Sequence, residues 1–366
     1  MSEGHRITLL AGAGMSVDAG LPTAVELAEK LRKCLTDLSQ NPEGSPSAVS
    51  TREQGNRWLA LYNFLNGGIR FQEGVLNRNP DEKVNIEQIA IAAEELQARM
   101  TSPLAAYSAG WHRRLEELER VDSSLFKSFV EFIYSRLQEW LVLDDPKRVS
   151  YLRGLTELTS NDVGLDIFTL NYDLCVETAL TAAGLTFSNG FNEDGIWSPQ
   201  DFDKQSKLRL YKLHGSLDWA DDQIYGLCSL QYPRHESAET IQGDDLRPLL
   251  IFGTLHKLSA REPFLTLAYH FSQRVLRTKV LSVIGYSFGD EHVNQIIEQG
   301  LKKNSDLRIL IVSPHAEDVV RQHRFLDRNP RVATIGSTAK TALNERLVAD
   351  KVRETLKDVR TEAPFS

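Results

Sequence analysis

The chain is poor in cysteine and has no long apolar run, and both absences narrow what it can be. Its three cysteines, Cys34, Cys175 and Cys228, lie far apart in 366 residues. No C-x-x-C pair is therefore present to build a zinc knuckle or a thioredoxin-type redox site. No stretch approaches the roughly 20 apolar residues of a membrane helix, and residues 7–11 are too short for a signal-peptide core. We expect a cytoplasmic protein without metal, disulfide scaffold or membrane association.

Positive charge is outnumbered by negative charge. The chain has 42 Lys and Arg against 50 Asp and Glu, a formal net charge of −8. This balance disfavours direct binding to nucleic acid. Hydrophobic residues make up 41% and charged residues 25% of the sequence, as is usual for folded domains. The length allows two or three domains, or one large domain with an insertion.

Short apolar runs separated by helical or loop-like segments predict a parallel sheet. They lie at residues 6–10, 165–170, 208–213, 249–252, 280–284 and 307–312. Several are apolar on both faces, which is typical of strands covered on two sides. We predict an α/β protein with a Rossmann-like, doubly wound, mostly parallel sheet and a large all-helical insertion. The polar stretches 199–206 and 218–245 predict surface loops.

The segment between the first two predicted strands has helical patterns. Thr23 is a candidate N-cap with Glu26 three residues later, and apolar residues then recur at helical spacing. Residues from about 36 to 56 are rich in Ser, Pro, Gly, Asn and Gln and predict a long loop. Further on, an apolar stripe that includes Phe126 and Phe129 predicts a helix.

These patterns suggest one interrupted sheet domain rather than two domains in tandem. We assign residues 1–35 and 151–366 to the Rossmann-like domain. Residues 57–143 form the predicted helical insertion, which has the size of a lid or an oligomerisation module. Its tryptophans are also compatible with an ordinary core.

A glycine-rich turn follows the first predicted strand. It reads Gly12-Ala13-Gly14-Met15-Ser16. Glycines at such a turn let the backbone approach a pyrophosphate, whose charge then meets N–H groups and a helix start. Val17 stands where G-x-G-x-x-G requires a third glycine. Alone, the motif is also compatible with an ordinary turn.

Two more polar motifs follow predicted strands. T-L-N-Y-D contains Asn171 and Asp173, and K-L-H-G-S contains His214. Open α/β sheets bind ligands beyond the carboxyl ends of their strands, which is where these residues fall. Taken singly, the Asn could be a helix cap and the His a structural residue.

In this order, G-A-G-M-S, T-L-N-Y-D and H-G-S resemble the sirtuin superfamily, in particular the zinc-less bacterial sirtuin-like domains of anti-phage defence systems. A fourth match, I-G-Y-S-F-G-D-E-H at residues 284–292, looks like the segment that lines the dinucleotide site. The likeness runs from about residue 10 to about residue 312, with the helical block inserted between the first two motifs.

The resemblance implies NAD as the bound substrate. It places Ala13, Gly14 and Ser16 against the phosphates and ribose, and Asp173 beside the nicotinamide ribose. It also places Gly285 and Ser287 at the phosphate or ribose.

The resemblance implies Asn171 and His214 as the catalytic pair. An Asn can orient water or a hydroxyl while charge develops at C1′, and a His can move a proton near neutral pH. Asp290 and His292 are weaker candidates, because polar loop residues often serve only local hydrogen bonds.

Two departures separate the chain from deacylating sirtuins. The four-cysteine zinc module is missing, and Leu21-Pro22-Thr23-Ala24 replaces a Pro-Asp-Phe-Arg stretch. Water is then the expected acceptor. The resemblance thus implies an NAD glycohydrolase that releases nicotinamide and ADP-ribose as an antiviral effector.

Two alternatives stay open, a non-catalytic sensor of NAD or ADP-ribose and an NAD-dependent protein deacylase. The resemblance also suggests control by homo-oligomerisation or by a HerA-type ATPase partner. The sequence does not identify the trigger, the oligomeric state or the partner, and it leaves open whether water or a protein group accepts ADP-ribose.

Overall fold

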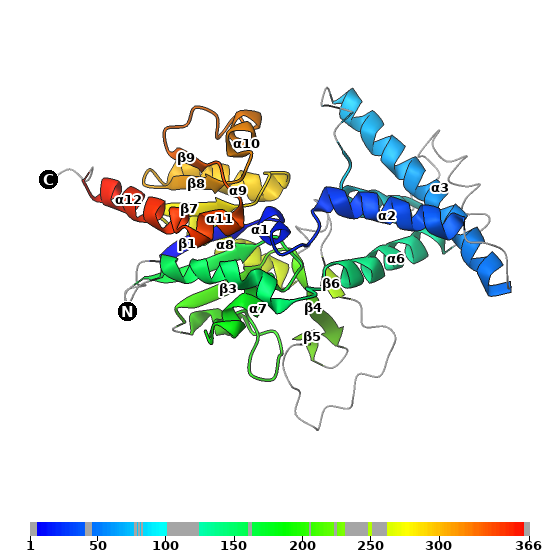
Figure 1. The fold of residues 1–366 in the computed structure, drawn as a ribbon, viewed down its shortest axis with the longest axis horizontal. Helices are drawn as coiled ribbons and strands as arrows, with labels where there is room; N and C mark the ends of the chain where they lie inside the picture. The colour runs from blue at the N-terminus through cyan, green and yellow to red at the C-terminus, as the bar shows by residue number, and fades with distance from the viewer. Residues whose placement is uncertain are drawn as a thin grey trace. The chain divides into compact units, whose positions relative to one another are not determined.

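The computed structural model divides into two compact units, one made of Met1–Leu21 with Leu141–Ser366 and the other of Pro22–Trp140 (Figure 1). It describes residues 6–40, 46–76, 79, 81, 83–100, 124–159, 163–204, 206–222, 225–230, 248–250 and 262–361. The first unit contains the predicted sheet and the second is helical.

A six-stranded sheet organises the first unit. Its strands are β1 (Arg6–Ala11), β2 (Gly164–Thr169), β3 (Leu208–Lys212), β7 (Val280–Ile284), β8 (Arg308–Val312) and β9 (Val332–Ile335). Their order is β3-β2-β1-β7-β8-β9, and every neighbouring pair is parallel. This is the doubly wound order, with its reversal between β1 and β7. The predicted fold class is confirmed.

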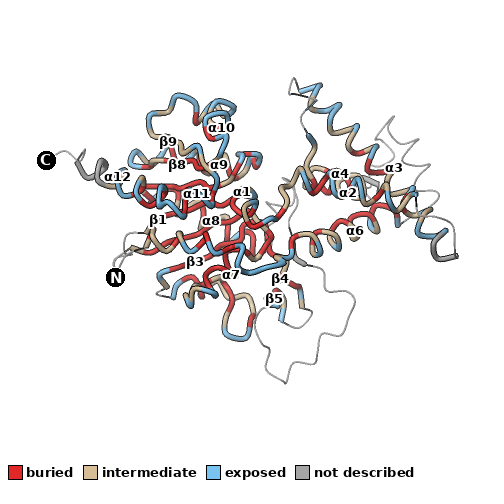
Figure 2. The backbone as a smooth tube through the Cα atoms, viewed as in Figure 1, coloured by how far each residue is buried: buried red, intermediate tan, exposed pale blue. Residues whose placement is uncertain are grey.

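Helices cover both faces of this sheet. Leu9 and Ile167 pack on one face with α1 (Gly14–Val17), η2 (Pro146–Leu158), α7 (Cys175–Ala182), α11 (Ala339–Asn344) and α12 (Leu347–Thr361). Leu10 and Phe168 pack on the other with α8 (Phe264–Val275), α9 (Glu291–Lys303) and α10 (Ala316–Gln322). Figure 2 shows the strands as the most continuously buried part of this unit.

The register of the sheet brings four strand ends to one level. Ala11 pairs with Thr169 and with Ile284, and Thr169 pairs with Lys212. The loops that follow β1, β2, β3 and β7 therefore leave one edge of the sheet side by side.

One strand prediction and two loop predictions differ from the structure. Residues 249 and 250 of the predicted run 249–252 do not extend the parallel sheet, because β6 (Pro248–Leu250) joins β4 (Gly215–Asp222) and β5 (Gly226–Ser229) in a small antiparallel sheet of order β5-β4-β6. Residues 251 and 252 lie outside the described residues. Strands β4 and β5 occupy part of the predicted loop 218–245, and the 3₁₀ helix η3 (Pro199–Asp203) occupies part of the predicted loop 199–206. Short polar strands of this kind lack the apolar runs used to find the main sheet.

The helical unit contains α2 (Ala24–Ser39), α3 (Pro46–Val75), α4 (Ile86–Met100) and α6 (Leu125–Trp140). Thr23 caps α2 as predicted: its Oγ1 accepts from the Glu26 N–H, and Glu26 Oε2 accepts from the Thr23 N–H at 2.7 Å. Helix α2 packs on α3, α4 and α6. The boundary between the units thus lies at Leu21 and Pro22 rather than at residue 35.

The loop predicted for residues 36–56 was also wrong in its described parts. Helix α2 continues to Ser39, and α3 begins at Pro46. Gly55 in α3 is a close-packing position, because a Cβ there would lie 2.8 Å from Leu38 Cβ. Glycine counts as a loop signal in the sequence, but Gly55 instead lets helices α2 and α3 pack closely. The predicted apolar stripe of α6 is confirmed, since Phe126 and Phe129 are buried.

Candidate functional site at the carboxyl edge of the sheet

The motif residues gather at the edge where β1, β2, β3 and β7 end. Gly12 follows β1, Asn171 lies two residues beyond β2, His214 two residues beyond β3, and Gly285 directly follows β7. The reversal in strand order between β1 and β7 falls at this edge. Doubly wound sheets bind ligands in the crevice at such a point. The site thus combines the expected position with residues from four separate segments.

The glycine turn after β1 lies directly against the loop after β7. The Gly14 N–H donates to the Gly285 carbonyl at 2.8 Å, and the Gly12 N–H donates to the Ile284 carbonyl at 3.0 Å. Gly285 has a φ of +65°, and a Cβ there would lie 2.3 Å from the Met15 nitrogen. Only glycine fits such a contact without displacing backbone. The turn is therefore fixed in place by the neighbouring strand's loop.

A one-turn helix that the sequence did not predict follows the glycine turn, before the predicted helix that Thr23 caps. Helix α1 spans only Gly14–Val17, and the chain then turns at Gly20, where φ is +90°. The long helix α2 lies in the other unit. A strong helix dipole at the turn, as the sequence suggested, is therefore absent from the described chain.

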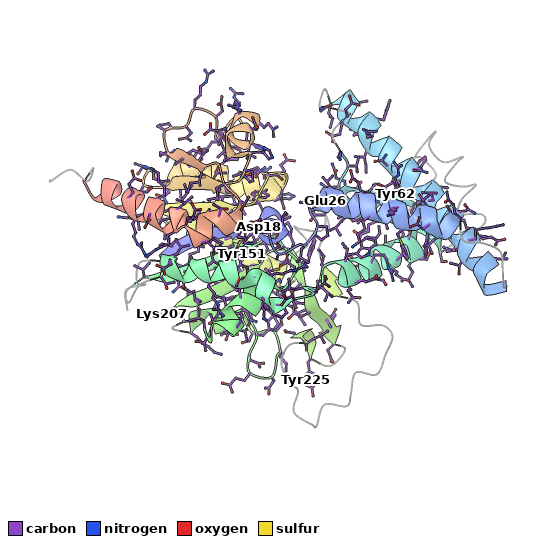
Figure 3. The ribbon with its side chains drawn as sticks, viewed as in Figure 1. Asp18, Glu26, Tyr62, Tyr151, Lys207 and Tyr225 are labelled. Carbon is purple, nitrogen blue, oxygen red and sulfur yellow. The ribbon has the colours of Figure 1, made fainter. Side chains whose placement is uncertain are left out.

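Tyr151 of η2 holds this short helix from outside the motifs. Its hydroxyl donates to the Met15 carbonyl, and burial raises the pKa of this phenol. Figure 3 shows the two labelled residues Tyr151 and Asp18 in the sheet unit.

Asn171 connects the loop after β2 to the glycine turn. Its side-chain Nδ2 donates to the Gly12 carbonyl and to Ser16 Oγ, both at 3.1 Å. Its own N–H donates to Thr169 Oγ1 at 3.0 Å. Both amide hydrogens of Asn171 thus have partners in the protein, and these partners orient the side chain. Oδ1 is then the side-chain atom available to a ligand. The structure therefore brings together the predicted residues Asn171, Ser16 and the glycine turn.

Asp173 lies two residues before the first residue of helix α7. Its Oδ1 accepts from the Cys175 N–H at 3.0 Å, and its side chain is buried. The Cys175 thiol also contacts Asp173 and Ser16, and burial, followed by the Asp173 carboxylate, raises the pKa of this thiol. A thiol held in its protonated form is a poor nucleophile. Cys175 is therefore part of the packing behind the site.

A buried ion pair lies beneath the loop after β2. Lys212 Nζ donates to Glu177 Oε1 at 2.9 Å and to the carbonyls of Asp173 and Tyr172, at 2.5 and 3.4 Å. Burial alone would lower the pKa of Lys212, but Glu177 and other carboxylates outweigh it and leave that pKa raised. Burial raises the pKa of Glu177.

Sequence reasoning missed Lys212 and Glu177. The available signal was a lysine as the last residue of the strand Leu208–Lys212, in which Leu208, Leu210 and Tyr211 are buried. A buried charge of this kind requires a partner. The lysine ties β3 to the main chain just after Asn171.

His214 forms a buried pair with Asp290. Its Nε2 lies 2.9 Å from Asp290 Oδ2, and both side chains are 6% exposed. Nδ1 of this imidazole is buried and has no hydrogen-bond partner among the described residues. Buried polar atoms are almost always paired, so an orphaned nitrogen here is the kind of atom that a ligand hydroxyl would satisfy.

The remaining candidates are arranged more loosely. Ser287 and Ala13 are exposed at the edge, and Ser287 offers its carbonyl to His323 Nε2 at 3.3 Å. The main-chain N–H of His292 donates to Asp290 Oδ1. Of the two weaker sequence candidates, Asp290 thus contacts His214 directly. His292 contributes a main-chain hydrogen bond to Asp290.

Three further features concern metal ions, membranes and cavities. In the described ranges, no group of three or more His, Cys, Asp or Glu residues could hold a metal ion. None of their helices is long and apolar enough to cross a membrane. A cavity of about 540 Å³ lies within the helical unit, lined by Tyr62, which Figure 3 labels, together with Arg32 and Arg70.

Residues 166–332 match the family model described as the SIR2-like domain. The match contains Asn171, Asp173, His214, Ser287 and Asp290. A comparison with curated proteins gave no match.

Solved structures of Sir2 proteins align over most of the chain at low similarity. A mutant Sir2 homologue in complex with 2′-O-acetyl ADP-ribose has 14% identity and a TM-score of 0.44, covering 97% of this chain and 94% of that one. A Sir2 homologue–NAD complex has 15% identity and a TM-score of 0.42, with 97% and 91% covered. Since these scores lie below 0.5, the fold assignment rests on the strand order and the parallel registers.

Proposed function

We propose that the chain binds NAD at the carboxyl edge of its sheet and hydrolyses it to nicotinamide and ADP-ribose. The observation that carries this proposal is the contact of Asn171 with the glycine turn and Ser16, together with a buried His214 whose Nδ1 has no hydrogen-bond partner among the described residues. The match of residues 166–332 to the SIR2-like domain supports the same ligand class.

The chemistry requires one bond to break and one to form at the ribose C1′ atom. The electron pair of the C1′–N bond returns to the pyridinium nitrogen, and neutral nicotinamide leaves. A water oxygen bonds to C1′, and its proton passes to His214 and then to solvent. In this scheme Asn171 orients the water or a ribose hydroxyl through Oδ1, and His214 accepts the proton.

The fixed glycine turn suits the phosphates of a dinucleotide. Glycine allows the backbone to approach a pyrophosphate closely, and a main-chain hydrogen bond holds Gly14 against Gly285. Because the one-turn helix α1 supplies little dipole, backbone N–H groups and Ser16 carry most of the binding in this scheme.

Nicotinamide release tests the proposal directly. The purified chain is incubated with NAD, and free nicotinamide and ADP-ribose are quantified for the wild type, Asn171→Ala and His214→Ala. We expect near-complete loss in both variants. Asn192→Ala is the control, because Asn192 lies in the loop before β3 and its side chain accepts only local N–H groups. Full activity in both test variants would refute the assignment.

The same assay separates the two alternatives. Tight binding of NAD without any release of nicotinamide would indicate a sensor. Release of nicotinamide only together with consumption of an acetyl-lysine peptide would indicate a deacylase. No zinc module accompanies the motifs in the sequence, so we favour water as the acceptor.

The helical unit, Pro22–Trp140, is the part we assign to control. A freely active NAD hydrolase would deplete the cofactor of its own cell, so we propose that this unit mediates homo-oligomerisation or contact with a partner such as a HerA-type ATPase in antiviral defence. Sedimentation velocity with a parallel rate measurement tests it. A monomer that hydrolyses NAD at its full rate alone would count against this role.

A further inference from the structure

The loop after β7 is built to hold one carboxylate in a fixed orientation. Asp290 caps helix α9: its Oδ1 accepts from the N–H groups of His292 at 2.9 Å and Val293 at 3.2 Å. The Asp290 N–H donates to the Tyr286 hydroxyl at 2.9 Å, and Asn294 Nδ2 donates to the Phe288 carbonyl at 2.7 Å. This leaves Oδ2 facing His214.

The local backbone confirms that this loop is strongly constrained. Phe288 has a φ of +58°, which is unfavourable for a residue with a side chain. Its ring is almost fully buried against Tyr286, with ring centroids 4.8 Å apart. Packing and the Asn294 hydrogen bond therefore hold a strained turn whose result is the position of Asp290.

The pair fixes which nitrogen of His214 carries the proton. A carboxylate oxygen only accepts hydrogen bonds, so the 2.9 Å contact with Asp290 Oδ2 requires a proton on Nε2. In a neutral imidazole the other nitrogen, Nδ1, then has the lone pair. That atom is the one left without a partner among the described residues.

We propose that Asp290 is a positioning residue that holds His214 as its Nε2–H tautomer, so that Nδ1 is the atom that accepts the proton in the reaction. The identity of the reaction in this proposal rests on the proposed function. The assignment of the tautomer does not depend on it. When Nδ1 takes a proton from the attacking water, both ring nitrogens carry protons. The Nε2–H contact to Asp290 then becomes a charge-assisted hydrogen bond, which stabilises the imidazolium.

Asp290→Asn separates this role from that of a helix cap. Asn caps helices about as well as Asp. Because the two backbone N–H groups require an acceptor, the amide oxygen takes the place of Oδ1, and Nδ2 faces His214. An N–H donor at that position requires a lone pair on Nε2, so the proton moves to Nδ1. The variant thus keeps the cap and reverses the tautomer.

The decisive measurement is imidazole ¹⁵N NMR of the full chain labelled with ¹⁵N-histidine, near neutral pH. The His214 signals are identified by their loss in His214→Gln. We expect the Nε2–H tautomer in the wild type and the Nδ1–H tautomer in Asp290→Asn. An Nδ1–H tautomer or an imidazolium in the wild type, or an unchanged tautomer in the variant, would overturn the proposal. This readout does not depend on NAD turnover.

The kinetic consequence is a loss in kcat with little change in KM. General bases contribute on the order of 10²–10⁴-fold, so we expect Asp290→Asn to lose kcat within that range. Asp145→Asn is the matched control, because Asp145 caps η2 through the Lys147 N–H and lies outside the motifs. A wild-type kcat in Asp290→Asn would refute the role of Asp290, whereas a wild type without turnover would refute only the proposed function.

Discussion

Lys212 and Glu177 form a buried ion pair directly beneath the loop that carries Asn171, with Nζ and Oε1 2.9 Å apart. The lysine also binds the carbonyls of Tyr172 and Asp173, so its charge is used to fix main chain. The second carboxylate oxygen of Glu177 has no hydrogen-bond partner within the described ranges. The Glu177 carboxylate thus depends on Lys212 for its charge partner, so removal of the lysine should lower the free energy of unfolding.

Lys212→Met should destabilise the protein strongly. The free energy of unfolding should fall by about 3–5 kcal/mol, because Glu177 is left buried without its counter-charge. Lys207→Met is the control: Lys207 is exposed just before the same strand and should change stability by no more than about 0.5 kcal/mol. Urea denaturation followed by circular dichroism measures both.

The double variant Lys212→Met/Glu177→Leu should recover a large part of that loss. Replacing both members of a buried ion pair by apolar residues is often neutral or stabilising. Nicotinamide release should stay low, however, because the carbonyls after Asn171 lose their donor. Recovery of both stability and activity would show that Lys212 does not position this loop.

Gly285→Ala should destabilise more than its conformation alone explains. A φ of +65° costs an alanine about 1–2 kcal/mol, and the added Cβ would also lie 2.3 Å from the Met15 nitrogen. Gly184→Ala isolates the first effect, since Gly184 has a φ of +69° with no atom within 4 Å of its Cβ position. Thermal unfolding of the two variants should show the larger loss for Gly285→Ala; equal losses would contradict the close contact of the loops.

Asn171→Asp should lose both stability and activity although it changes one atom. The carboxylate cannot donate to the Gly12 carbonyl or to Ser16 Oγ, and it repels that carbonyl. We expect a loss of about 1–3 kcal/mol in unfolding free energy. In Asn192→Asp the side-chain oxygen still accepts from the N–H groups of Asp194 and Ile196, so chemical denaturation should find this control close to wild type.

His270 should make the protein less stable as the solution becomes acidic. Burial, and next the nearby Arg274, lower the pKa of this imidazole from its ordinary value of 6.5. Below pH 6.5 the unfolded chain binds a proton that the folded chain resists, so stability falls as pH falls. The slope from one site is at most about 1.4 kcal/mol per pH unit, and partial exposure reduces it.

His270→Phe should therefore flatten the dependence of unfolding free energy on pH between about 7 and about 5. The ring of His270 lies beside Tyr211 and Phe202, with centroids 5.4 and 5.3 Å apart, so an aromatic replacement keeps the packing. An unchanged slope would show that the imidazole titrates normally in the folded state.

The sequence predicted most of the sheet because several of its strands are apolar on both faces. Leu9, Ile167 and Leu310 belong to runs that only a doubly covered sheet buries. The small antiparallel sheet was not predicted, since β4 contains polar residues such as Asp218 and Asp222 that give no apolar run. The strand β9 was missed because its residues are only half-buried at the sheet's edge.

The positions of site residues could be predicted where a motif follows a strand, but their partners could not. Asn171 and His214 were found from their distance to strand ends. The contact between His214 and Asp290 joins residues 76 positions apart, and no local pattern encodes it. The same holds for Gly285, whose need for a positive φ depends on the loop after β1.

The main-chain hydrogen bond between Gly14 and Gly285 has a consequence for the order in which parts of the site can form during synthesis. Strand β1 is made before β7, and the loop that fixes its glycine turn emerges only after β7. During translation the nascent chain therefore carries the motif long before the motif is in place. His214 likewise has no hydrogen bond to Asp290 until Asp290 has been made. The site is complete only once Asp290 has been made, while β8 and β9 still follow, so a chain terminated before Asp290 contains most of the site's residues without their arrangement.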